Sequence, residues 1–487
     1  MSELPILNGV LKYIKEKNTL FCMPGHKGGL GFLFTYEGNE FIKNMIEFDL
    51  TEVEGLDNLH HSSGIINESC NMLSRLYNSK KSYFLVNGST SGNLSMIFAA
   101  FNEGDKILVE RNCHRSIFNG IILRKLKPLY IKDIVYERYN APLALDTENC
   151  LKLIRENKDA KGIVLTYPNY YGICSNLKEI VSEAKKYNMK VLVDSAHGAH
   201  FGISENLPEN PLDIGADMVV MSAHKTLPSL TQTAFLHIGK ESTVNMDKVD
   251  FYVSAFLSTS PSYLFLCSMD YSRFYLEKWG ENHYNKLIQI ADIYREKINK
   301  LDIFHVIGKE DIGILNKYYG SRDDLNDIDL TRYVINVEEG FSGNKLYDYL
   351  KEKGIQCEMS DSFNVICILS TFQGEKQLDK LYKVLKNCDK EVLRDSNNKS
   401  FKYKEINVQA NLLPYEVMDR KYIWKNFKES EGKIAYDSIV FYPPGVPIIM
   451  PGEIINKEII DSICYYKDEG TDILGLKKGK IRVVSEE

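Results

Sequence analysis

Short apolar runs alternate with amphipathic stretches between residues 82 and 239, and this pattern predicts an α/β domain. Several runs are apolar at consecutive positions, such as GIVLTYP at 162–168 and KVLVD at 190–194. Strands that are apolar on both faces are typical of a parallel sheet covered by helices on each side. Between these two runs, LKEIVSEAKKYN at 177–188 places its apolar residues on one helical stripe. The predicted strands are 82–86, 106–110, 162–168, 190–194, 217–222 and 234–239.

The pattern changes to longer helical stretches beyond this region. The segment 261–301 is helical and increasingly charged, which predicts long helices leaving the first domain. A second unit then mixes strand patterns (RYVINVE, NVICILS) with helical ones (NKLYDYLKEKG, EKQLDKLYKVLKN). We therefore expect an N-terminal segment at 1–40, a large domain at 41–300 and a small C-terminal domain at 301–487. The most polar stretch, about 389–404, is expected to be a boundary loop.

Composition and charge narrow the class of protein. The chain has 487 residues, with 60 Lys and Arg against 66 Asp and Glu, which gives a formal net charge of −6. This balance argues against binding nucleic acid through bulk charge. No apolar run reaches the roughly 18 residues of a membrane-spanning helix, and the first residues contain no apolar signal segment. The cysteines are scattered without a Cys-x-x-Cys pair, so we expect reduced thiols in a cytoplasmic protein.

A turn rich in Gly, Ser and Thr lies between a predicted strand and a predicted helix, at residues 87–93 (NGSTSGN). Free backbone N–H groups at a helix N-terminus, together with the hydroxyls of Ser89, Thr90 and Ser91, offer donors for a phosphate. The same segment alone is also compatible with an ordinary helix cap. The glycine motifs of nucleotide-binding loops are absent after this strand, which argues against a nucleotide site.

Two ionisable residues follow other predicted strands. Asp194 ends one strand, at the edge where open α/β sheets bind ligands, and a buried acid there needs a positive partner. Lys225 follows another strand, and a desolvated lysine can form an imine with a carbonyl cofactor. Taken singly, Asp194 is equally consistent with a turn cap and Lys225 with a surface lysine. His197 and His200 lack further spaced ligands, so no metal site is expected.

Together, the turn, Asp194 and Lys225 match the needs of pyridoxal 5′-phosphate (PLP). Its phosphate requires a helix N-terminus, its pyridinium nitrogen a carboxylate, and its aldehyde a lysine. The carboxylate keeps the ring nitrogen protonated, so that the ring accepts the electron pair of a broken bond at Cα. PLP is therefore the cofactor that the sequence predicts.

Longer blocks resemble the ornithine/lysine/arginine decarboxylase family, whose members have the aspartate-aminotransferase-like PLP fold type I. They occur in the family's order between residues 21 and 453: FCMPGHKGG, DLTEVEGLDNLHHSSGII, NGSTSGN, RNCHRSI, TYPNYYG, DSAHGAH, SAHKTLPSLTQ, STSPSYLFLCSMD and YPPGVPIIMPGE. Because PGHKGG begins at residue 24, the chain resembles the short forms without the N-terminal wing domain. The resemblance implies a mostly parallel seven-stranded sheet in the large domain and a smaller α+β C-terminal domain.

The resemblance also implies a role for each matched residue. Lys225 would bind the cofactor aldehyde and return a proton to the substrate carbon, Asp194 would pair with the ring nitrogen, and His114 would stack on the ring. His197 would lie near the cofactor's 3′ oxygen, in a block (DSAH) that mixes the family's D-E-A-H and D-S-A-W forms. The residues expected to hold the phosphate are Ser89, Thr90, Ser91, Ser222 and His224, with Thr259 and Ser260 reaching the phosphate of a neighbouring subunit.

A substrate with a distal amine or guanidinium needs an anion away from the cofactor. Glu453, in the P-G-E block, is the expected residue, although P-G-E before a helical run is also a good capping sequence. The acidic stretch 49–57 is a weaker second source of negative charge. For the family-typical PGHK at 24–27, positioning of the structure and contact with the site both stay open.

These observations predict PLP-dependent decarboxylation of arginine, lysine or ornithine to an amine that serves as a polyamine precursor. Fold type I sites are built at subunit interfaces, so we expect at least a homodimer. An aminotransferase or lyase on the same fold, or a non-catalytic PLP-fold protein, are the alternatives. Aminotransferases for dicarboxylates usually carry a C-terminal arginine for the α-carboxylate, where this chain has YPPGVPIIMPGE. The sequence does not decide among the three amino acids.

Overall fold

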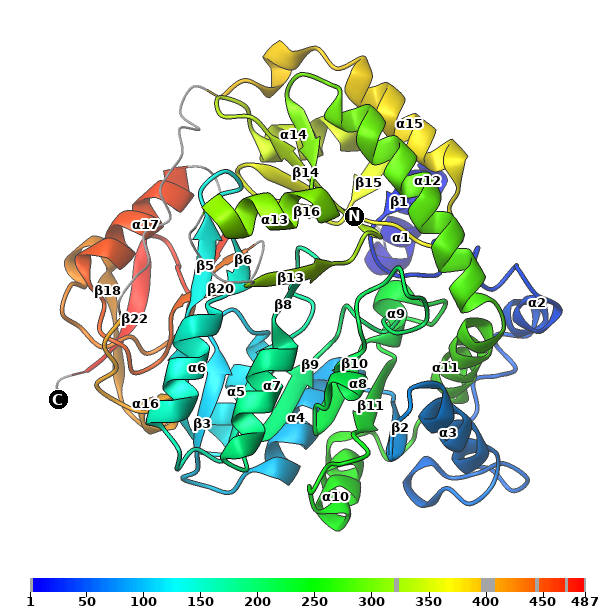
Figure 1. Cartoon of the computed structure of the whole chain (residues 1–487), viewed down its shortest axis with the longest axis horizontal. Coiled ribbons are helices and arrows are strands. Elements are labelled where there is room, and N and C mark those ends of the chain that lie inside the picture. Colours follow the sequence, from blue (N-terminus) through cyan, green and yellow to red (C-terminus); the bar gives the residue numbers. More distant parts are fainter. Residues whose placement is uncertain (1–2, 319–323, 396–407, 443–445, 469–471, 486–487) are drawn as a thin grey trace.

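A seven-stranded sheet lies at the centre of the large domain in the computed structural model, which describes residues 3–318, 324–395, 408–442, 446–468 and 472–485 (Figure 1). The strand order is β2-β11-β10-β9-β7-β3-β4. The strands are β2 (Lys81–Leu85), β3 (Lys106–Glu110), β4 (Lys127–Ile131), β7 (Gly162–Thr166), β9 (Lys190–Asp194), β10 (Met218–Met221) and β11 (Ala234–Ile238). Only β11 runs antiparallel to its neighbours. The predicted mostly parallel sheet is confirmed, whereas the strand pattern missed β4 at its edge.

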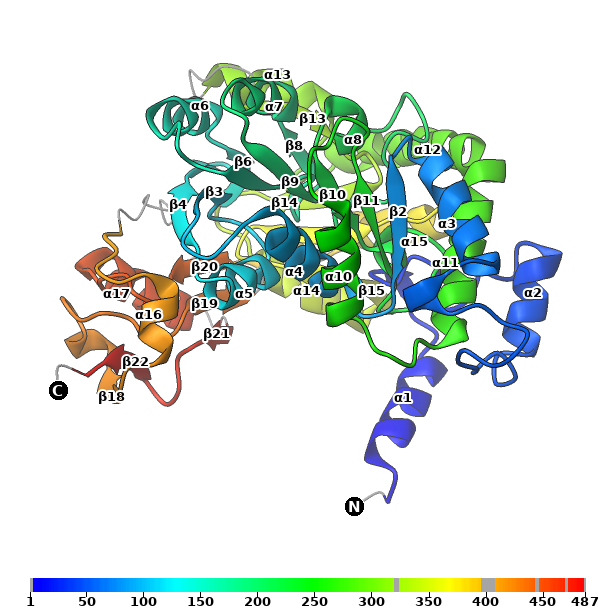
Figure 2. The same cartoon turned by 90° about the horizontal axis from the view of Figure 1, so that it is seen from below.

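Helices cover both faces of this sheet, which explains why its central strands are apolar at successive positions. Residues of β10 are all buried, and so are four of the five in β9. Figure 2 shows α6 (Thr147–Glu156) and α7 (Leu177–Lys186) on one face, with α4 (Gly88–Ala100) and α5 (Arg115–Leu123) on the other. The ends of the parallel strands therefore meet at one edge of the sheet, where loops are free to form a site.

The long helices expected after the large domain are α11 (Tyr263–Tyr275) and α12 (Glu281–Asn299). They lead to an antiparallel four-stranded sheet of order β12-β14-β17-β16. Its elements are β12 (Phe304–Val306), β14 (Arg332–Val337), β16 (Met359–Ser360), β17 (Asn364–Ile368) and the covering helices α14 (Gly343–Glu352) and α15 (Glu375–Lys386). The N-terminal segment joins this unit, because β1 (Thr19–Phe21) pairs in parallel with β15 (Ile355–Cys357). Helix α1 (Pro5–Lys15) projects away from the body (Figure 2).

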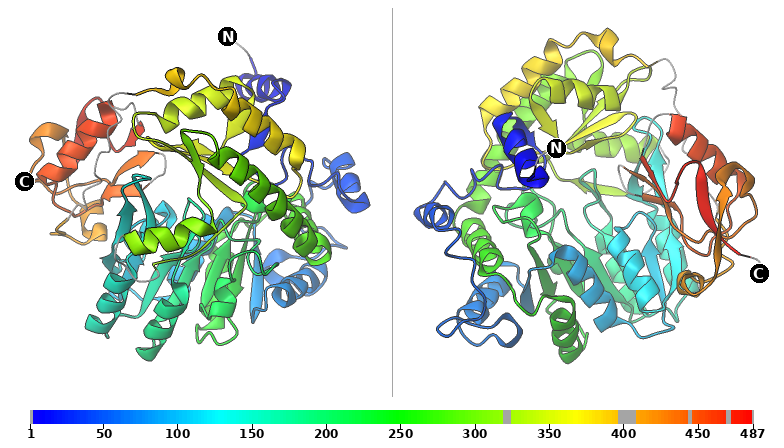
Figure 3. Two further views of the ribbon diagram at one scale, coloured as in Figure 1. Left: turned by 45° about the horizontal axis from the view of Figure 1, so that its top comes forward. Right: turned by 180° about the vertical axis from the view of Figure 1, so that it is seen from behind.

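A separate unit lies at the C-terminal end, on one side of the molecule (Figure 3). Its buried apolar residues form a core of their own, distinct from the core that the large domain shares with the four-stranded sheet. Its elements are α16 (Pro414–Met418), β18 (Tyr422–Asn426), β19 (Ile439–Tyr442), β20 (Val446–Ile449), α17 (Lys457–Asp468), β21 (Asp472–Leu474) and β22 (Lys480–Val484). Within the expected boundary loop, residues 396–404 lie outside the described part of the chain.

The remaining elements connect these units. They are α2 (Tyr36–Lys43), α3 (Ile65–Leu76), β5 (Asp133–Tyr136), β6 (Ala141–Leu145), β8 (Ile173–Ser175), α8 (Pro211–Ile214), α9 (Ala223–Thr226), α10 (Met246–Phe256), α13 (Lys309–Tyr318) and β13 (Leu325–Ile328). Within the described ranges, every helix is too short or too polar to cross a membrane. All ten cysteines are described, and each is a free thiol.

Candidate active site

Lys225 lies on the short helix α9, directly after β10, and its side chain is partly exposed. Its Nζ atom is 3.0 Å from Nε2 of His197. Burial among protein groups lowers the pKa of Lys225 to about 8, since desolvation disfavours the ammonium form. The lysine that the sequence singles out therefore has an amine with a reduced proton affinity.

The family-typical segment 24–27 packs against the same loop. The backbone N–H of Gly25 donates to the carbonyl oxygen of His224 at 2.8 Å. A Cβ atom at Gly25 would lie 2.5 Å from the carbonyl oxygen of Leu227, so only glycine fits this close approach. The segment thus packs against the backbone on both sides of Lys225, which supports a positioning role.

Asp194 ends β9 and is 2% exposed. Its Oδ2 atom accepts a hydrogen bond from the Asn93 amide at 2.8 Å, and Oδ1 accepts from the Ala196 N–H at 3.1 Å. The same Asn93 nitrogen donates to Oγ of Ser116, which lies 2.7 Å from Nδ1 of His114. A single network therefore orients both the acid and the stacking histidine that the sequence predicts. Asn93 and Ser116 were missed, because nothing in their own segments indicates this contact.

The expected phosphate turn opens α4. Gly88 has a φ of +73°, a conformation that glycine adopts without strain. The hydroxyl of Ser222, from the end of β10, donates to Oγ of Ser89 at 2.9 Å. Ser91 instead donates to the carbonyl of Gly88 at 2.8 Å, and Thr90 is exposed. The structure thus brings Ser89 and Ser222 together and leaves Thr90 accessible at the turn.

The other residues expected near the phosphate lie beside this turn or beside Lys225. Nδ1 of His224 donates to the carbonyl of Thr233 at 2.8 Å, so its proton lies on that nitrogen. The segment 258–260 is exposed, and the N–H of Ser258 contacts Oδ1 of Asn87 in the same chain at 3.4 Å. The predicted role of Thr259 and Ser260 toward a neighbouring subunit stays a prediction.

A buried arginine that the sequence analysis did not single out reaches His197 from the other side. Nη2 of Arg332, the first residue of β14, lies 3.0 Å from Nδ1 of His197. The only sequence signal was a charged residue at the start of the apolar run RYVINVE. A buried arginine near Lys225 therefore comes from a segment other than the C-terminal block.

Glu453 lies away from solvent, 3% exposed, in the C-terminal unit. Its two carboxylate oxygens accept hydrogen bonds from Arg111 at 2.7 and 2.8 Å, and Oε2 also accepts from the Met450 N–H at 2.7 Å. This two-pronged pair links the C-terminal unit to the loop after β3. The acid expected to meet a substrate cation therefore already holds a guanidinium.

The donor set at this edge of the sheet fits PLP. Lys225, Asp194 and the Ser89 turn follow β10, β9 and β2, whose carboxyl ends lie at the same edge of the sheet. They supply an amine of lowered pKa, an oriented carboxylate and hydroxyl donors at a helix start, which the aldehyde, ring nitrogen and phosphate of PLP require. Within the described part of the chain, no three His, Cys, Asp or Glu side chains are grouped to hold a metal ion.

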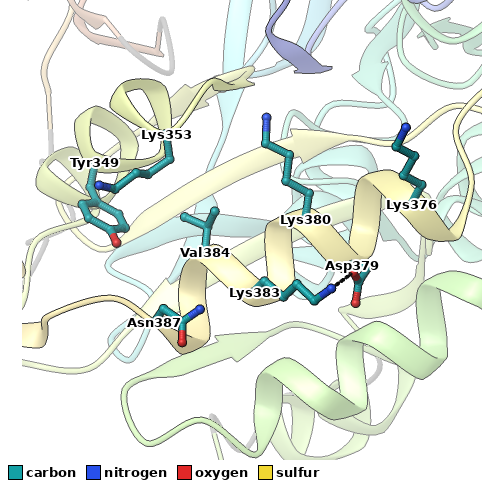
Figure 4. A pocket seen from close by; sticks show the side chains of 8 residues that line it. All are labelled: Tyr349, Lys353, Lys376, Asp379, Lys380, Lys383, Val384 and Asn387. Carbon is teal, nitrogen blue, oxygen red and sulfur yellow. Dashed lines mark ion pairs between the residues drawn. The ribbon is translucent and has the colours of Figure 1, made fainter.

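A separate surface pocket, of about 490 Å³, lies on α14 and α15 (Figure 4). It shares no residue with the site described above. Four of the side chains that line it are lysines, and Lys383 is paired with Asp379 at 2.7 Å. Since none of the matched motifs reaches it, we assign this pocket no part in the chemistry.

Comparisons with known proteins point to one family. The pattern of the family described as "Orn/Lys/Arg decarboxylase, major domain" matches residues 4–377, and that of the C-terminal domain matches 402–473. The chain is 32% identical to the uncharacterized protein YaaO of Bacillus subtilis, covering 98% of this chain and 97% of the relative. It is 30% identical to the arginine decarboxylase of that organism, covering 100% and 98%. The constitutive lysine decarboxylase of Escherichia coli has a similar structure, with a TM-score of 0.77 at 20% identity, covering 99% and 82%. The predicted PLP fold type I is confirmed.

Proposed function

The chain belongs to the Orn/Lys/Arg decarboxylase family and is an amino-acid decarboxylase; we propose that it uses PLP to decarboxylate a basic amino acid, arginine before lysine or ornithine. The observation that carries the proposal is the set at the sheet edge, where Lys225, Asp194 and the Ser89 turn lie at the carboxyl ends of β10, β9 and β2, on the same edge of the sheet. The preference for arginine is supported by the full-length relative named arginine decarboxylase.

When bound, PLP supplies an aldehyde that condenses with amines and a ring that withdraws the electron pair released as CO2 leaves Cα. Lys225 would hold the aldehyde and would then carry the proton that replaces the carboxylate. Asp194, fixed by Asn93 and by the Ala196 N–H, would keep the ring nitrogen protonated. His114, whose imidazole is oriented by Ser116, would cover one face of the ring.

The distal cation of the substrate needs a partner, and Glu453 remains our candidate. Its carboxylate already binds the guanidinium of Arg111 with both oxygens, so its geometry suits a guanidinium better than an ammonium. A substrate guanidinium would have to share or displace that of Arg111. Substitution of Glu453 should therefore change the affinity for the substrate as well as the stability of the fold.

We further propose a cytoplasmic homodimer whose amine product feeds polyamine synthesis. Free thiols at every cysteine support a reducing compartment. The exposed position of Thr259 and Ser260 is compatible with contact to a second copy. Analytical ultracentrifugation of the full chain tests the dimer.

The decisive experiment incubates the purified protein and PLP with arginine, lysine or ornithine, and measures CO2 and the amine formed. We expect stoichiometric CO2 and amine, with arginine the best substrate. Borohydride reduction followed by peptide mapping is expected to place the pyridoxyl group on Lys225. Release of a keto acid without CO2 would favour an aminotransferase, and bound PLP without turnover would favour a non-catalytic protein.

A further inference from the structure

Arg332 is a buried cation for which the reaction described above has no use. It is 1% exposed, and its backbone N–H donates to the carbonyl of Asp329 at 2.9 Å. Its Nε and Nη1 atoms are buried without a hydrogen-bond partner among the described residues. The contact between Nη2 and Nδ1 of His197, at 3.0 Å, is therefore its main polar side-chain interaction. A buried guanidinium is costly, so the role of this residue should lie in that contact.

The contact fixes where the proton of His197 resides. A guanidinium only donates hydrogen bonds, so Nδ1 of His197 must accept and carries no proton. A protonated imidazolium would direct an N–H at the guanidinium, which is excluded by the same geometry. His197 is therefore neutral, with its proton on Nε2. Burial, together with the nearby guanidinium of Arg332, lowers the pKa of His197 well below its usual value, which agrees with this assignment.

The proton on Nε2 in turn determines the state of Lys225. Nζ of Lys225 lies 3.0 Å from Nε2 of His197. An ammonium has no lone pair and only donates, so two donors would face each other if Lys225 were charged. A neutral amine accepts the hydrogen bond from Nε2. The alternative, an ammonium donating to a bare Nε2, would need the proton on Nδ1, where Arg332 opposes it.

We propose that Arg332 is a positioning residue that holds His197 in the tautomer with the proton on Nε2, and thereby favours the neutral form of the Lys225 amine, which is the form that attacks the cofactor aldehyde. This inference rests on the proposed function, in which that amine binds PLP. The two successive contacts, from Arg332 to His197 and from His197 to Lys225, form a relay that is present without the cofactor. This relay would explain why the amine is nucleophilic before PLP binds.

The charged groups around Lys225 act in both directions. Asp194 and Glu358 favour the ammonium, whereas desolvation and Arg332 disfavour it. The hydroxyl of Tyr170 donates to Glu358 at 2.8 Å, and the Tyr170 ring meets the His197 ring edge-on with centroids 4.9 Å apart. Two carboxylates thus pull Lys225 toward the charged form, and the relay from Arg332 opposes them.

The loop at 166–172 approaches Arg332 closely at a glycine. Gly172 has a φ of +83°, and a Cβ atom there would lie 2.8 Å from Cβ of Arg332. The block TYPNYYG at 166–172 therefore packs directly on the stem of Arg332 through its glycine and on His197 through Tyr170. The conformation of the loop fixes where the guanidinium can point.

The first experiment measures the tautomer of His197 in the cofactor-free full-length protein by NMR of ¹⁵N-labelled histidine, with the signal assigned through H197N. We expect a proton on Nε2 in the wild type and in R332K, which retains a charged donor, and a shift of the population toward Nδ1–H in R332M. The matched control is R295M. Arg295 is equally buried, at 4% exposed, and has an unpartnered Nε, but its Nη2 donates to the Leu330 carbonyl.

The second experiment measures the pKa of Lys225 by NMR after reductive ¹³C-methylation, with the signal assigned through its absence in K225R. In R332M, the amine gains an acceptor, so we expect its pKa to rise by about one to two units. R295M should leave it unchanged. In the H197F background, R332M should add less than it does alone, because the relay has already been broken.

These readouts separate the inference from the proposed function. A proton on Nδ1 of His197 in the wild type, or the same tautomer in R332M as in the wild type, would overturn the inference even if the enzyme decarboxylates arginine. A pKa of Lys225 that rises equally in R332M with and without His197 would reduce Arg332 to a through-space charge and also overturn it. Failure of PLP to label Lys225 would overturn the proposed function alone.

Discussion

Two lysines have the same lowered pKa but opposite surroundings. Burial lowers the pKa of Lys225 and of Lys27 to about 8 in each case. Lys27 is 3% exposed, and its Nζ donates to the carbonyls of Cys22 and of Ile368, the latter at 3.0 Å. Lys225 is partly exposed and faces an imidazole. A lowered pKa therefore does not identify a nucleophile; the partners of the amine do.

The partners explain the two roles. Carbonyl oxygens accept hydrogen bonds and hold an amine that donates, so Lys27 joins the N-terminal segment to β17 and has no free lone pair directed at a ligand. His197 can donate to Lys225 and leave it an acceptor. Substitutions that remove one of the two amines should therefore have different effects at Lys225 and at Lys27.

The largest expected effect is that of K225A. Removing the amine that binds the cofactor and returns the proton should lower kcat/KM by on the order of 1,000-fold or more, measured as CO2 release, and should abolish the borohydride-dependent pyridoxyl label. K27A is the counterpart, and its folded fraction should keep most of the activity and the label at Lys225. Label on Lys27 in either variant would contradict the distinction between the two lysines.

The shared pKa predicts a shared dependence of stability on pH. A lysine with a pKa of about 8 in the folded state and about 10.4 when unfolded binds fewer protons in the folded state between these values. The contribution of each lysine to the free energy of unfolding therefore rises with pH in this window, by about 3 kcal/mol for each lysine over the whole window. Because the cysteines and tyrosines titrate there too, the measurement is the difference in urea unfolding between the wild type and K27M or K225M.

That difference should grow from pH 8 to pH 10.5 in both variants. A difference that stays flat for one lysine would mean that its folded pKa is not lowered. A surface variant, K43M, provides the control, because Lys43 lies exposed on α2 and pairs with Glu40. Its stability difference from the wild type should not follow this window.

Glu358 acts on both lysines, whereas Asp194 acts on Lys225 and not on Lys27. D194N should lower kcat by on the order of 100-fold, since an amide cannot stabilise the protonated ring nitrogen, while Asn93 and the Ala196 N–H lose a charged acceptor. E358Q should leave kcat within a few-fold, because Glu358 contacts the Met23 N–H and Tyr170. Equal losses of kcat in the two variants would contradict the assignment of Asp194 to the cofactor ring.

Part of the fold and of the site could be predicted from local sequence patterns, and part could not. The apolar runs located six of the strands, because burial on both faces requires continuous apolar residues, but the edge strand β4 (KPLYI) carries half-buried residues and a proline. Lys225 and Asp194 were predictable from their position after such strands. Asn93, Ser116 and Arg332 were not, because their roles depend on contacts between segments far apart in the sequence, and no local pattern records these contacts.

The same limit applies to Glu453. Its local sequence matches the family, but nothing in that sequence indicates that it pairs with Arg111. E453Q keeps the shape of the side chain and an oxygen for Arg111, so it tests the charge alone. If the carboxylate binds the distal cation of the substrate, KM for arginine should rise about tenfold, or roughly 1.4 kcal/mol, with kcat nearly unchanged. R111Q should move KM in the opposite direction, because it removes the competing guanidinium. If both variants lose free energy of unfolding while KM stays unchanged, Glu453 has a structural role, like Lys27, in joining two segments of the chain. Another acid would then bind the distal cation of the substrate.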